Sequence, residues 1–298
     1  MTHQVKATVV IITRNRKMDL RRAVVSALTQ TARPEILVID DGSTDGTSEM
    51  IVYDFPTVCL LSDARSKGYI VQRNRAARVA SGEVIVSIDD DACFSSQDVI
   101  EHTLGEFSDK RIGAVAIPFV NLNHGGIINQ IAPSCKGIYI APAFCGTAYA
   151  IRRDLFMRLD GFKEAFFHQG EEDEFCIRML DLGFFVRLGT AGPVYHYESP
   201  IRDHRRFHIF GPRNVILNTW VNVPTLYLLP HMLINTLNIC MHGLRVRQFP
   251  LKLQGILKGY GAIPRLSRLR APVSTKTYRL FRKLKRIGFL PIEDARAT

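Results

Sequence analysis

The first ninety residues alternate between short, continuous apolar runs and segments with helical spacing. The apolar runs are rich in β-branched residues, as buried strands are, and they occupy residues 7–15, 34–47 (ending in an acidic turn), 58–63 and 83–91. Helical patterns lie between them at residues 19–30, 48–55 and 70–81. This alternation predicts an α/β fold with a mostly parallel central sheet, and the continuous apolar strands indicate that helices cover both of its faces.

Polar side chains follow three of these predicted strands. Thr13 ends the first, Asp40–Asp41 the second and Asp89–Asp91 the fourth. Because ligands bind beyond the carboxyl ends of parallel strands, we expect these groups to converge on one crevice. The sequence lacks both G-x-G-x-x-G and G-x-x-x-x-G-K-[ST], which argues against a dehydrogenase and a P-loop NTPase. The three aspartates could hold Mg²⁺ against a diphosphate, or they could form a solvated acidic turn that caps the next helix.

The positive charge of the chain is concentrated near its carboxyl end. The 298 residues carry a net charge of +11, and residues 245–298 contain 14 Lys and Arg against two acids. A basic tail indicates an anionic partner, such as a membrane surface, nucleic acid or a phosphorylated substrate. The six cysteines form no C-x-x-C pair and the amino terminus does not resemble a secretory signal, so we expect a reduced, cytoplasmic setting.

Residues 221–244 form the most apolar segment. Pro224, Pro230 and several polar residues argue against a transmembrane span. The spacing predicts an apolar helical face made of Val223, Leu226, Leu233, Leu237, Met241 and Leu244. A polar face is predicted from His231, Asn235, Asn238 and His242. Such a helix either packs on the body of the protein or lies in a membrane interface, and the basic tail favours the membrane.

Six segments in a fixed order carry a family resemblance: VVIITRNR, ILVIDDGSTDGT, QRNRAARVASGEVIVSIDDDA, FCGTAYAIRRDLFMRLDGFKEAFF, GEEDEFCIRM and VYHYESPIRDHRRFHIFGPRN. Together they resemble the inverting family 2 glycosyltransferases, which have the GT-A fold. The resemblance implies a catalytic domain at residues 1–220 that transfers a sugar, with inversion, from a nucleotide-sugar donor to a hydroxyl of a glycan or lipid-linked acceptor. It also implies Mg²⁺ or Mn²⁺ as cofactor. Residues 221–298 are then an amphipathic, basic, helical extension, which we expect to associate with an anionic membrane surface at the cytoplasmic face.

The resemblance assigns the donor site to residues from several motifs. Those matched to nucleotide-sugar binding are Thr13, Arg14, Asp40, Asp41, Arg73, Asn74, Asp89, Asp90 and Arg213. Thr13 and Asp41 match the residues that hold the nucleobase, where a carboxylate can accept a ring N–H. Arg73 matches a diphosphate contact, which suits the planar guanidinium, and Asn74 supports it. Arg213, in an Arg-Asn pair with Asn214, is a second and weaker match to the diphosphate.

The metal site of the family also has its counterpart. Asp89-x-Asp91 matches the D-x-D motif, with Asp91 as the direct metal ligand and Asp89 on the ribose or on a water bound to the ion. His196 matches a histidine near the metal or the leaving group. The middle aspartate, Asp90, is given only a supporting role.

The catalytic base of the family is matched by the acidic run at 171–174. Glu172 aligns with the base that takes the proton from the acceptor hydroxyl, although the family more often has Asp there. Glu171 and Asp173 therefore remain alternatives for the base, and an acidic first turn stabilised by the helix dipole is the structural alternative. Gly146 and Thr147 match a turn that faces the acceptor.

Two other functions would use some of the same features. A nucleotidyltransferase that activates a sugar phosphate would also need metal-binding aspartates, but it usually has a glycine- and lysine-rich loop after the first strand, and TRNRKMD has the cations without the glycines. A nucleic-acid-binding protein could use the basic tail, but the sequence lacks a recognisable binding motif, so we do not expect nucleic acid as a partner. The sugar, the nucleotide, the acceptor and the oligomeric state are not predicted.

Overall fold

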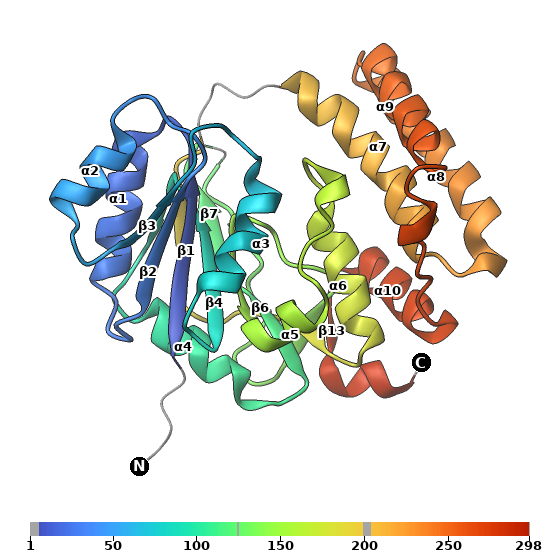
Figure 1. Ribbon diagram of the computed structural model, residues 1–298. Coiled ribbons are helices and arrows are strands. Elements are labelled where there is room, and N and C mark those ends of the chain that lie inside the picture. Colours follow the sequence, from blue (N-terminus) through green and yellow to red (C-terminus); the bar gives the residue numbers. More distant parts are fainter. Residues whose placement is uncertain (1–5, 124, 199–203, 298) are drawn as a thin grey trace.

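The computed structural model describes residues 6–123, 125–198 and 204–297, and a nine-stranded sheet forms its centre (Figure 1). Four parallel strands build the amino-terminal half of the sheet in the order β4-β1-β2-β3: β1 (Ala7–Thr13), β2 (Glu35–Asp40), β3 (Cys59–Ser62) and β4 (Val84–Asp89). The connecting helices are α1 (Lys17–Leu28), α2 (Thr47–Asp54) and α3 (Tyr69–Val79). The predicted α/β alternation is confirmed, with bounds that differ by a few residues.

The other half of the sheet is mixed in direction. It continues from β4 through β10 (Ala148–Arg152), β6 (Ile112–Ala116), β11 (Phe185–Leu188), β9 (Tyr139–Ala141) and β13 (Leu290–Pro291). β10 is antiparallel to both of its neighbours, and β9 is antiparallel to β11 and β13, so these two strands run against the rest of the sheet. The sheet is therefore mostly parallel, as predicted.

A second, four-stranded sheet lies beside the first and is important for the site. Its order is β5-β12-β7-β8, with β5 (Ala92–Phe94), β12 (Val194–His196), β7 (Phe119–Asn121) and β8 (Ile128–Asn129). β5 directly follows the three aspartates, and β12 pairs with it so that His196 lies opposite Ala92. This pairing joins two segments that are about a hundred residues apart in the sequence.

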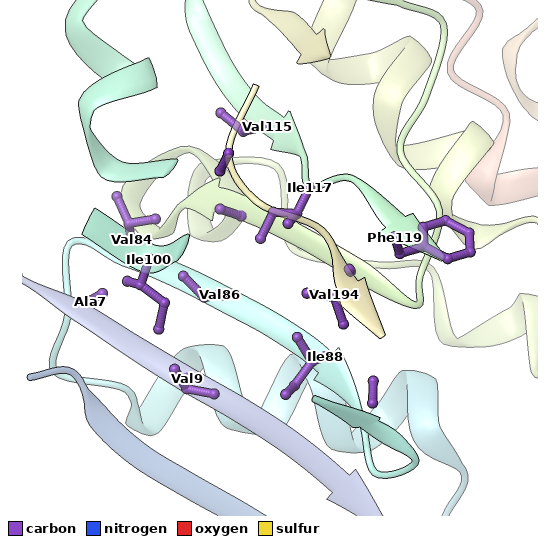
Figure 2. Packing of buried hydrophobic residues seen from close by; sticks show 14 of the residues in the cluster. Ala7, Val9, Val84, Val86, Ile88, Ile100, Val115, Ile117, Phe119 and Val194 are labelled. Atoms are coloured by element: carbon purple, nitrogen blue, oxygen red, sulfur yellow. The ribbon is translucent and has the colours of Figure 1, made fainter. Parts of the chain in front are cut away.

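The central strands are buried on both faces. Figure 2 shows Val9, Val86, Ile88 and Val115 of the main sheet packed with Ile100 of α4 (Val99–Gly105) and residues of the second sheet. On the opposite face, Val10, Leu37, Ile39 and Ile85 pack into a second core cluster with residues of α3, α5 (Arg153–Arg158) and α6 (Glu171–Asp181). Burial on both sides explains why these strands read as continuous apolar runs rather than alternating ones.

The carboxyl-terminal part is helical and packs on the α/β body. It comprises α7 (His204–Asn222), α8 (Thr225–Arg245), α9 (Phe249–Ala262) and α10 (Thr275–Ile287), with 3₁₀ turns at Ser267–Leu269 and Ile292–Ala297. Two further 3₁₀ turns, Glu106–Ser108 and Glu164–Phe166, belong to the α/β body. α8 and α9 lie against α7, and α10 lies against α6. α9 approaches α7 closely at Gly255 and Gly259, where an added Cβ would lie 2.3 Å from the Ile209 carbonyl oxygen and 2.9 Å from Ile216 Cβ.

The helical part is joined to the main sheet as well. β13 pairs with β9, and the Ile292 N–H donates to the Ile138 carbonyl oxygen at 2.9 Å. α7 spans the boundary predicted at residue 220, and the division into two domains stays a prediction. Among the helices of the described ranges, none has both the length and the apolar character needed to cross a bilayer.

Candidate functional site

The carboxyl ends of β1, β2 and β4 bring the predicted polar groups together. β1 pairs with β2 so that Thr13 lies opposite Asp40, and the Asp41 N–H donates to the Thr13 carbonyl oxygen at 2.9 Å. The Thr13 hydroxyl donates to Asp90 Oδ2 at 2.8 Å, which joins the end of β1 to the acidic turn after β4. The expected convergence at one edge of the sheet is therefore present.

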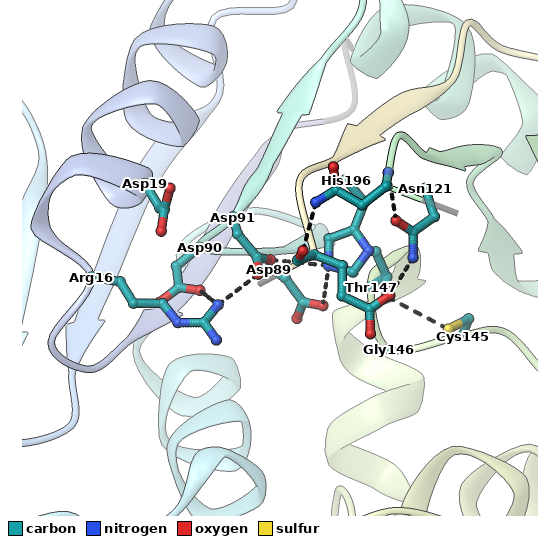
Figure 3. Close-up of polar contacts among 12 residues, drawn as sticks. Arg16, Asp19, Asp89, Asp90, Asp91, Asn121, Cys145, Gly146, Thr147 and His196 are labelled. Carbon is teal, nitrogen blue, oxygen red and sulfur yellow. Dashed lines mark hydrogen bonds and ion pairs between the residues drawn. The ribbon is translucent and has the colours of Figure 1, made fainter. Parts of the chain in front are cut away.

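Asp89, Asp91 and His196 form a group that could hold a metal ion (Figure 3). One ligand atom from each lies within 4.8 Å of the other two. His196 Nε2 is 3.0 Å from Asp91 Oδ1 and 3.9 Å from Asp89 Oδ2. Two carboxylates and an imidazole are ligands that a divalent cation accepts, so the residues present fit the predicted metal site.

The electrostatics of the acidic turn separate its three members. Burial raises the pKa of Asp89, and the nearby Asp91 adds to that rise. Burial also raises the pKa of Asp90 to about 7. Burial acts against ionisation of Asp91 too, but His196 and Arg16 outweigh it and lower the pKa of Asp91 to about 2. Asp91 is thus the carboxylate held most firmly in its charged form, which is the form that binds a cation.

Arg16 is a site residue that the sequence interpretation missed. Its Nη1 lies 2.6 Å from Asp91 Oδ2 and 3.1 Å from Asp90 Oδ1 (Figure 3). The sequence does show a cation-rich segment, TRNRK, after the first strand, but it does not show which of these cations reaches the acidic turn. Only the contacts in the folded protein identify Arg16. Arg14, which was predicted to bind the donor, is exposed just beyond the end of β1.

Arg73 of α3 connects the acidic turn to the acid pair of α6. Its Nη2 lies 3.4 Å from Asp89 Oδ1, its Nη1 lies 3.4 Å from Glu171 Oε1, and Nη2 donates to the Gly146 carbonyl oxygen at 2.8 Å. The guanidinium lies over the Tyr69 ring, 5.0 Å from its centre. Two acidic segments about eighty residues apart thus face one buried cation.

The acid pair begins α6, directly after Gly170, which has a left-handed backbone (φ 79°). Glu171 is fully buried, and the Tyr69 hydroxyl donates to its Oε2 at 3.2 Å. Burial raises the pKa of both glutamates, and the charge of Glu171 raises that of Glu172 further. A carboxylate with a raised pKa holds a proton more strongly, as a general base must.

Gly146 lies against the predicted base. A Cβ at this position would be 2.5 Å from Glu172 Oε1 and 2.9 Å from Arg73 Nη1, so any larger residue in the turn before β10 would displace the ends of both side chains. The next residue, Thr147, accepts the Asp89 N–H on its carbonyl oxygen at 3.2 Å. Both predicted acceptor residues therefore border the acidic turn and the acid pair, while their contact with an acceptor stays a prediction.

Asp173 lies on a different side of α6. Both of its carboxylate oxygens accept from Lys285 Nζ of α10, at 2.7 and 2.6 Å. Glu172 Oε1, by contrast, lies close to Gly146, as the guanidinium of Arg73 does. This arrangement favours Glu172 over Asp173 as the base.

Asp40 and Asp41 bind the surrounding loops. Asp41 accepts from the Ser66 hydroxyl, the Lys67 and Gly68 N–H groups and Gln72 Nε2, at 2.5 to 3.0 Å. Burial opposes ionisation of Asp41, but these hydrogen bonds lower its pKa. Asp40 accepts from the Ser43 N–H and the Ser48 hydroxyl. The contact of Asp41 with a nucleobase stays a prediction, and a base N–H would compete with these four donors.

Asn74, Arg213 and Asn214 position the segment that precedes the acid pair. Asn74 Nδ2 donates to the Phe162 carbonyl oxygen at 2.8 Å, and the Phe162 N–H donates back at 2.9 Å. Arg213 Nη1 donates to the Ala165 carbonyl oxygen at 2.9 Å. Asn214 Nδ2 lies 2.7 to 2.8 Å from the carbonyl oxygens of the turn that leads into α6, those of Phe166, His168 and Gln169. The described contacts of Arg213 hold this turn, and its predicted contact with the diphosphate stays a prediction.

Comparison with known proteins supplies the family. The model of glycosyl transferase family 2 matches residues 8–159, which is just over half of the chain. A probable glycosyltransferase of Bacillus subtilis, YdaM, is 26% identical over 216 residues, covering 65% of this chain and 51% of that protein. The O-antigen chain rhamnosyltransferase WbaN of Salmonella anatum is 24% identical over 212 residues, covering 64% of this chain and 66% of that protein. The aligned region thus spans between half and two thirds of the length of these two relatives.

Solved structures with the same arrangement of elements support the fold. The mannosyltransferase PcManGT of Pyrobaculum calidifontis, in complex with GDP-Man and Mn²⁺, has a TM-score of 0.61 at 18% identity, covering 96% of this chain and 81% of that one. TarS 1–349 of S. aureus, in complex with UDP, has a TM-score of 0.60 at 18% identity, covering 94% of this chain and 87% of that one. The family match, the relatives and the fold agree, so this chain belongs to glycosyl transferase family 2 and has the GT-A fold.

Proposed function

We propose that the protein transfers a sugar, with inversion, from a nucleotide-sugar donor to a hydroxyl of a lipid-linked or glycan acceptor, in a reaction that depends on Mn²⁺ or Mg²⁺. The observation that carries this proposal is the position of Arg73, which contacts Asp89 of the acidic turn and Glu171 of the acid pair at once. A donor diphosphate held at the acidic turn and an acceptor hydroxyl at the acid pair would then meet beside Arg73 and Gly146.

Each part of the site has a task in this reaction. Glu172 takes the proton of the acceptor hydroxyl as the oxygen attacks the anomeric carbon. Arg73 donates hydrogen bonds to the leaving diphosphate, and Tyr69 keeps the guanidinium and Glu171 in place. Asp89, Asp91 and His196 would hold the divalent ion, whose charge stabilises the leaving nucleoside diphosphate. The Mn²⁺ and nucleotide ligands bound in the solved structures that share the GT-A fold support this proposed division of tasks.

The exposed side of α8 supports a membrane location for the enzyme. Seven apolar residues of α8 are each between 50% and 77% exposed, and their helical spacing places them on one continuous face, here called the α8 apolar face. They are Leu226, Leu229, Leu233, Ile234, Leu237, Met241 and Leu244. Five of the six residues predicted for an apolar face belong to it, whereas Val223 precedes the helix and is buried. A continuous apolar surface of this length on a helix indicates an interaction site.

Two of the four residues predicted for the polar side of the same helix, His231 and Asn235, face the protein, whereas Asn238 and His242 are exposed. Asn235 Nδ2 donates to the Thr219 hydroxyl of α7 at 2.9 Å, and His231 Nδ1 is hydrogen-bonded to the Tyr278 hydroxyl of α10. Leu228 and Met232 of the same helix are buried as well, so the side of α8 that packs on the body combines polar and apolar residues. The helix does pack on the body, but its apolar face is left for a surface outside the protein.

The charge of the helical part is complementary to an anionic surface. From residue 204 to residue 292 the sequence contains no Asp or Glu, and Lys and Arg recur throughout. Each Lys or Arg near an anionic membrane adds about 1 kcal/mol of attraction at low salt. We therefore propose that the enzyme binds peripherally to the cytoplasmic face of a membrane through the α8 apolar face.

Sedimentation with vesicles of phosphatidylcholine and phosphatidylglycerol tests this location. Leu233→Gln with Leu237→Gln removes two half-exposed leucines, which we expect to weaken binding at least tenfold, since a fully buried leucine contributes about 1.5–3 kcal/mol. The matched control is Val52→Gln with Tyr53→Gln on α2, whose side chains are 59% and 81% exposed on the far side of the molecule (Figure 1). Equal binding of the two double variants to the vesicles would contradict the proposal that the α8 apolar face binds the membrane.

Product analysis tests the transfer reaction itself. The enzyme is incubated with Mn²⁺, a panel of nucleotide sugars and lipid-linked or glycan acceptors, and the products are separated and examined by NMR. We expect a nucleoside diphosphate and a glycoside whose anomeric configuration is opposite to that of the donor. Release of pyrophosphate would identify a nucleotidyltransferase instead, and retention of configuration would contradict the role given to Glu172.

A further inference from the structure

A cavity of about 770 Å³ lies between α6, α7, α8 and α10, apart from the acidic turn. One wall is basic and is formed by α10, which contributes Arg279, Arg282, Lys283, Lys285 and Arg286. The other walls combine apolar side chains, such as Ile177 and Val215, with amides and hydroxyls of α7 and α8. Its volume is in the range of ligand sites in proteins. We call it the α10 cavity.

The positive charge of the α10 cavity is not balanced by its own acids. Asp173 is the acidic residue of its lining, and it is paired with Lys285 at 2.6 Å. Arg282 lies 3.3 Å from the His231 ring, and burial together with this charge lowers the pKa of His231 to about 4, so the imidazole is neutral at physiological pH. Four basic side chains therefore face the cavity without a carboxylate partner among its lining residues. Such a wall favours a ligand with a phosphate or diphosphate group.

The position of the cavity connects two surfaces that an acceptor would have to reach. Tyr227 and His231 of α8 line it, and on the same helix they adjoin Leu226 and Ile234 of the α8 apolar face. At its other side it includes Asp173, which is on the first turn of α6 like the proposed base Glu172 but faces Lys285 of α10. The basic wall thus lies between the proposed membrane surface and the first turn of α6, the turn that also carries the acid pair.

We propose that the α10 cavity binds the phosphate or diphosphate group of a lipid-anchored acceptor and holds its hydroxyl-bearing part toward the acid pair. This assignment rests on the proposed transfer to an acceptor hydroxyl and names the chemical class of that acceptor. The lipid chain leaves the cavity along α8 into the bilayer. The arginine forks donate to the phosphate oxygens, and the neutral His231 and the amides of α7 complete the polar lining.

The test measures binding of monomeric octyl phosphate to the full chain by titration calorimetry, without donor, metal or turnover. We expect saturable binding at one site that is tighter than that of inorganic phosphate. Arg282→Gln with Arg286→Gln should weaken it at least tenfold, which is about 1.4 kcal/mol. The matched control, Arg265→Gln with Arg268→Gln, removes two exposed charges of the same basic region outside the cavity and should leave the affinity unchanged.

Three results would overturn the proposal. An equal loss in both double variants would show diffuse attraction to the basic region rather than a site. Equal affinity for octyl phosphate and inorganic phosphate would show an ion site without a lipid ligand, and no saturable binding would show no site. If the first double variant fails to fold, Lys283→Gln with Arg286→Gln must give the same loss. Donor affinity is measured in parallel: a chain that binds octyl phosphate but no nucleotide sugar contradicts the proposed function and leaves the cavity assignment standing.

Discussion

Replacing Gly146 by alanine would place a methyl group between the two halves of the site. The added Cβ would lie 2.5 Å from Glu172 Oε1, and an ordinary contact begins at 3.4 Å, so the carboxylate must move by about 0.9 Å. Arg73 Nη1, at 2.9 Å from the same Cβ, must shift as well. A displacement of about 1 Å of a reacting group lowers a rate by about 100-fold. We therefore expect kcat of Gly146→Ala to fall by about that factor.

The stability of this variant should change far less than its rate. Both clashing atoms are at the ends of side chains, so we expect a loss of about 1 kcal/mol in the free energy of unfolding, at the low end for overpacked sites. The control is Gly105→Ala, since Gly105 has a helical backbone and a Cβ there meets nothing within 4 Å. Initial rates of sugar transfer and urea unfolding are measured for both. Wild-type kcat in Gly146→Ala would refute the placement of Glu172 as the reacting carboxylate.

Three further predictions concern the pH profile, the metal and the turn before α6. We expect activity to rise with pH as Glu172 loses its proton. Because the charge of Glu171 adds to the effect of burial in raising the pKa of Glu172, Glu171→Gln should move this rise to lower pH in a profile of kcat against pH. A rise that moves to higher pH would contradict the coupling between the two glutamates. Asp91→Ala should abolish the increase in melting temperature that Mn²⁺ gives the wild type, an effect worth about 2.7 kcal/mol at a hundredfold excess over Kd; an unchanged increase would remove Asp91 from the metal site. Asn214→Ala leaves buried carbonyl oxygens of the turn without their donor and should lower the free energy of unfolding by about 2–3 kcal/mol in urea titrations, whereas no loss would show that the turn is held by other contacts.

The parallel half of the fold could be predicted because its signals are local. The β-branched runs that became β1 and β4 are buried on both faces, so each reads as a strand without knowledge of its neighbours. The end of each parallel strand then places Thr13 and the acidic turn at one edge of the sheet. The directions of β10 and β9 depend on pairing with strands that are distant in the sequence, so local sequence patterns could not predict them.

The site depended more on contacts between distant segments. His196 reaches Asp91 only because β12 pairs with β5, and Arg73 of α3 reaches Glu171 only because the fold brings the start of α6 to it. Local pattern cannot show that Arg16 pairs with the acidic turn. It also cannot show which side of α8 faces the protein, because that depends on the packing of His231 on α10 and of Asn235 on α7.

The measurement that tests the central claim most directly compares Glu172→Gln with Asp173→Asn. Transfer rate and donor affinity are determined for both variants with Mn²⁺ present. If Glu172 takes the proton of the acceptor, Glu172→Gln loses about 10²- to 10⁴-fold in kcat with donor Kd unchanged, and Asp173→Asn, whose carboxylate faces Lys285, stays within a few-fold of wild type. A Glu172→Gln enzyme that turns over at the wild-type rate, or an Asp173→Asn enzyme that does not turn over, would contradict it.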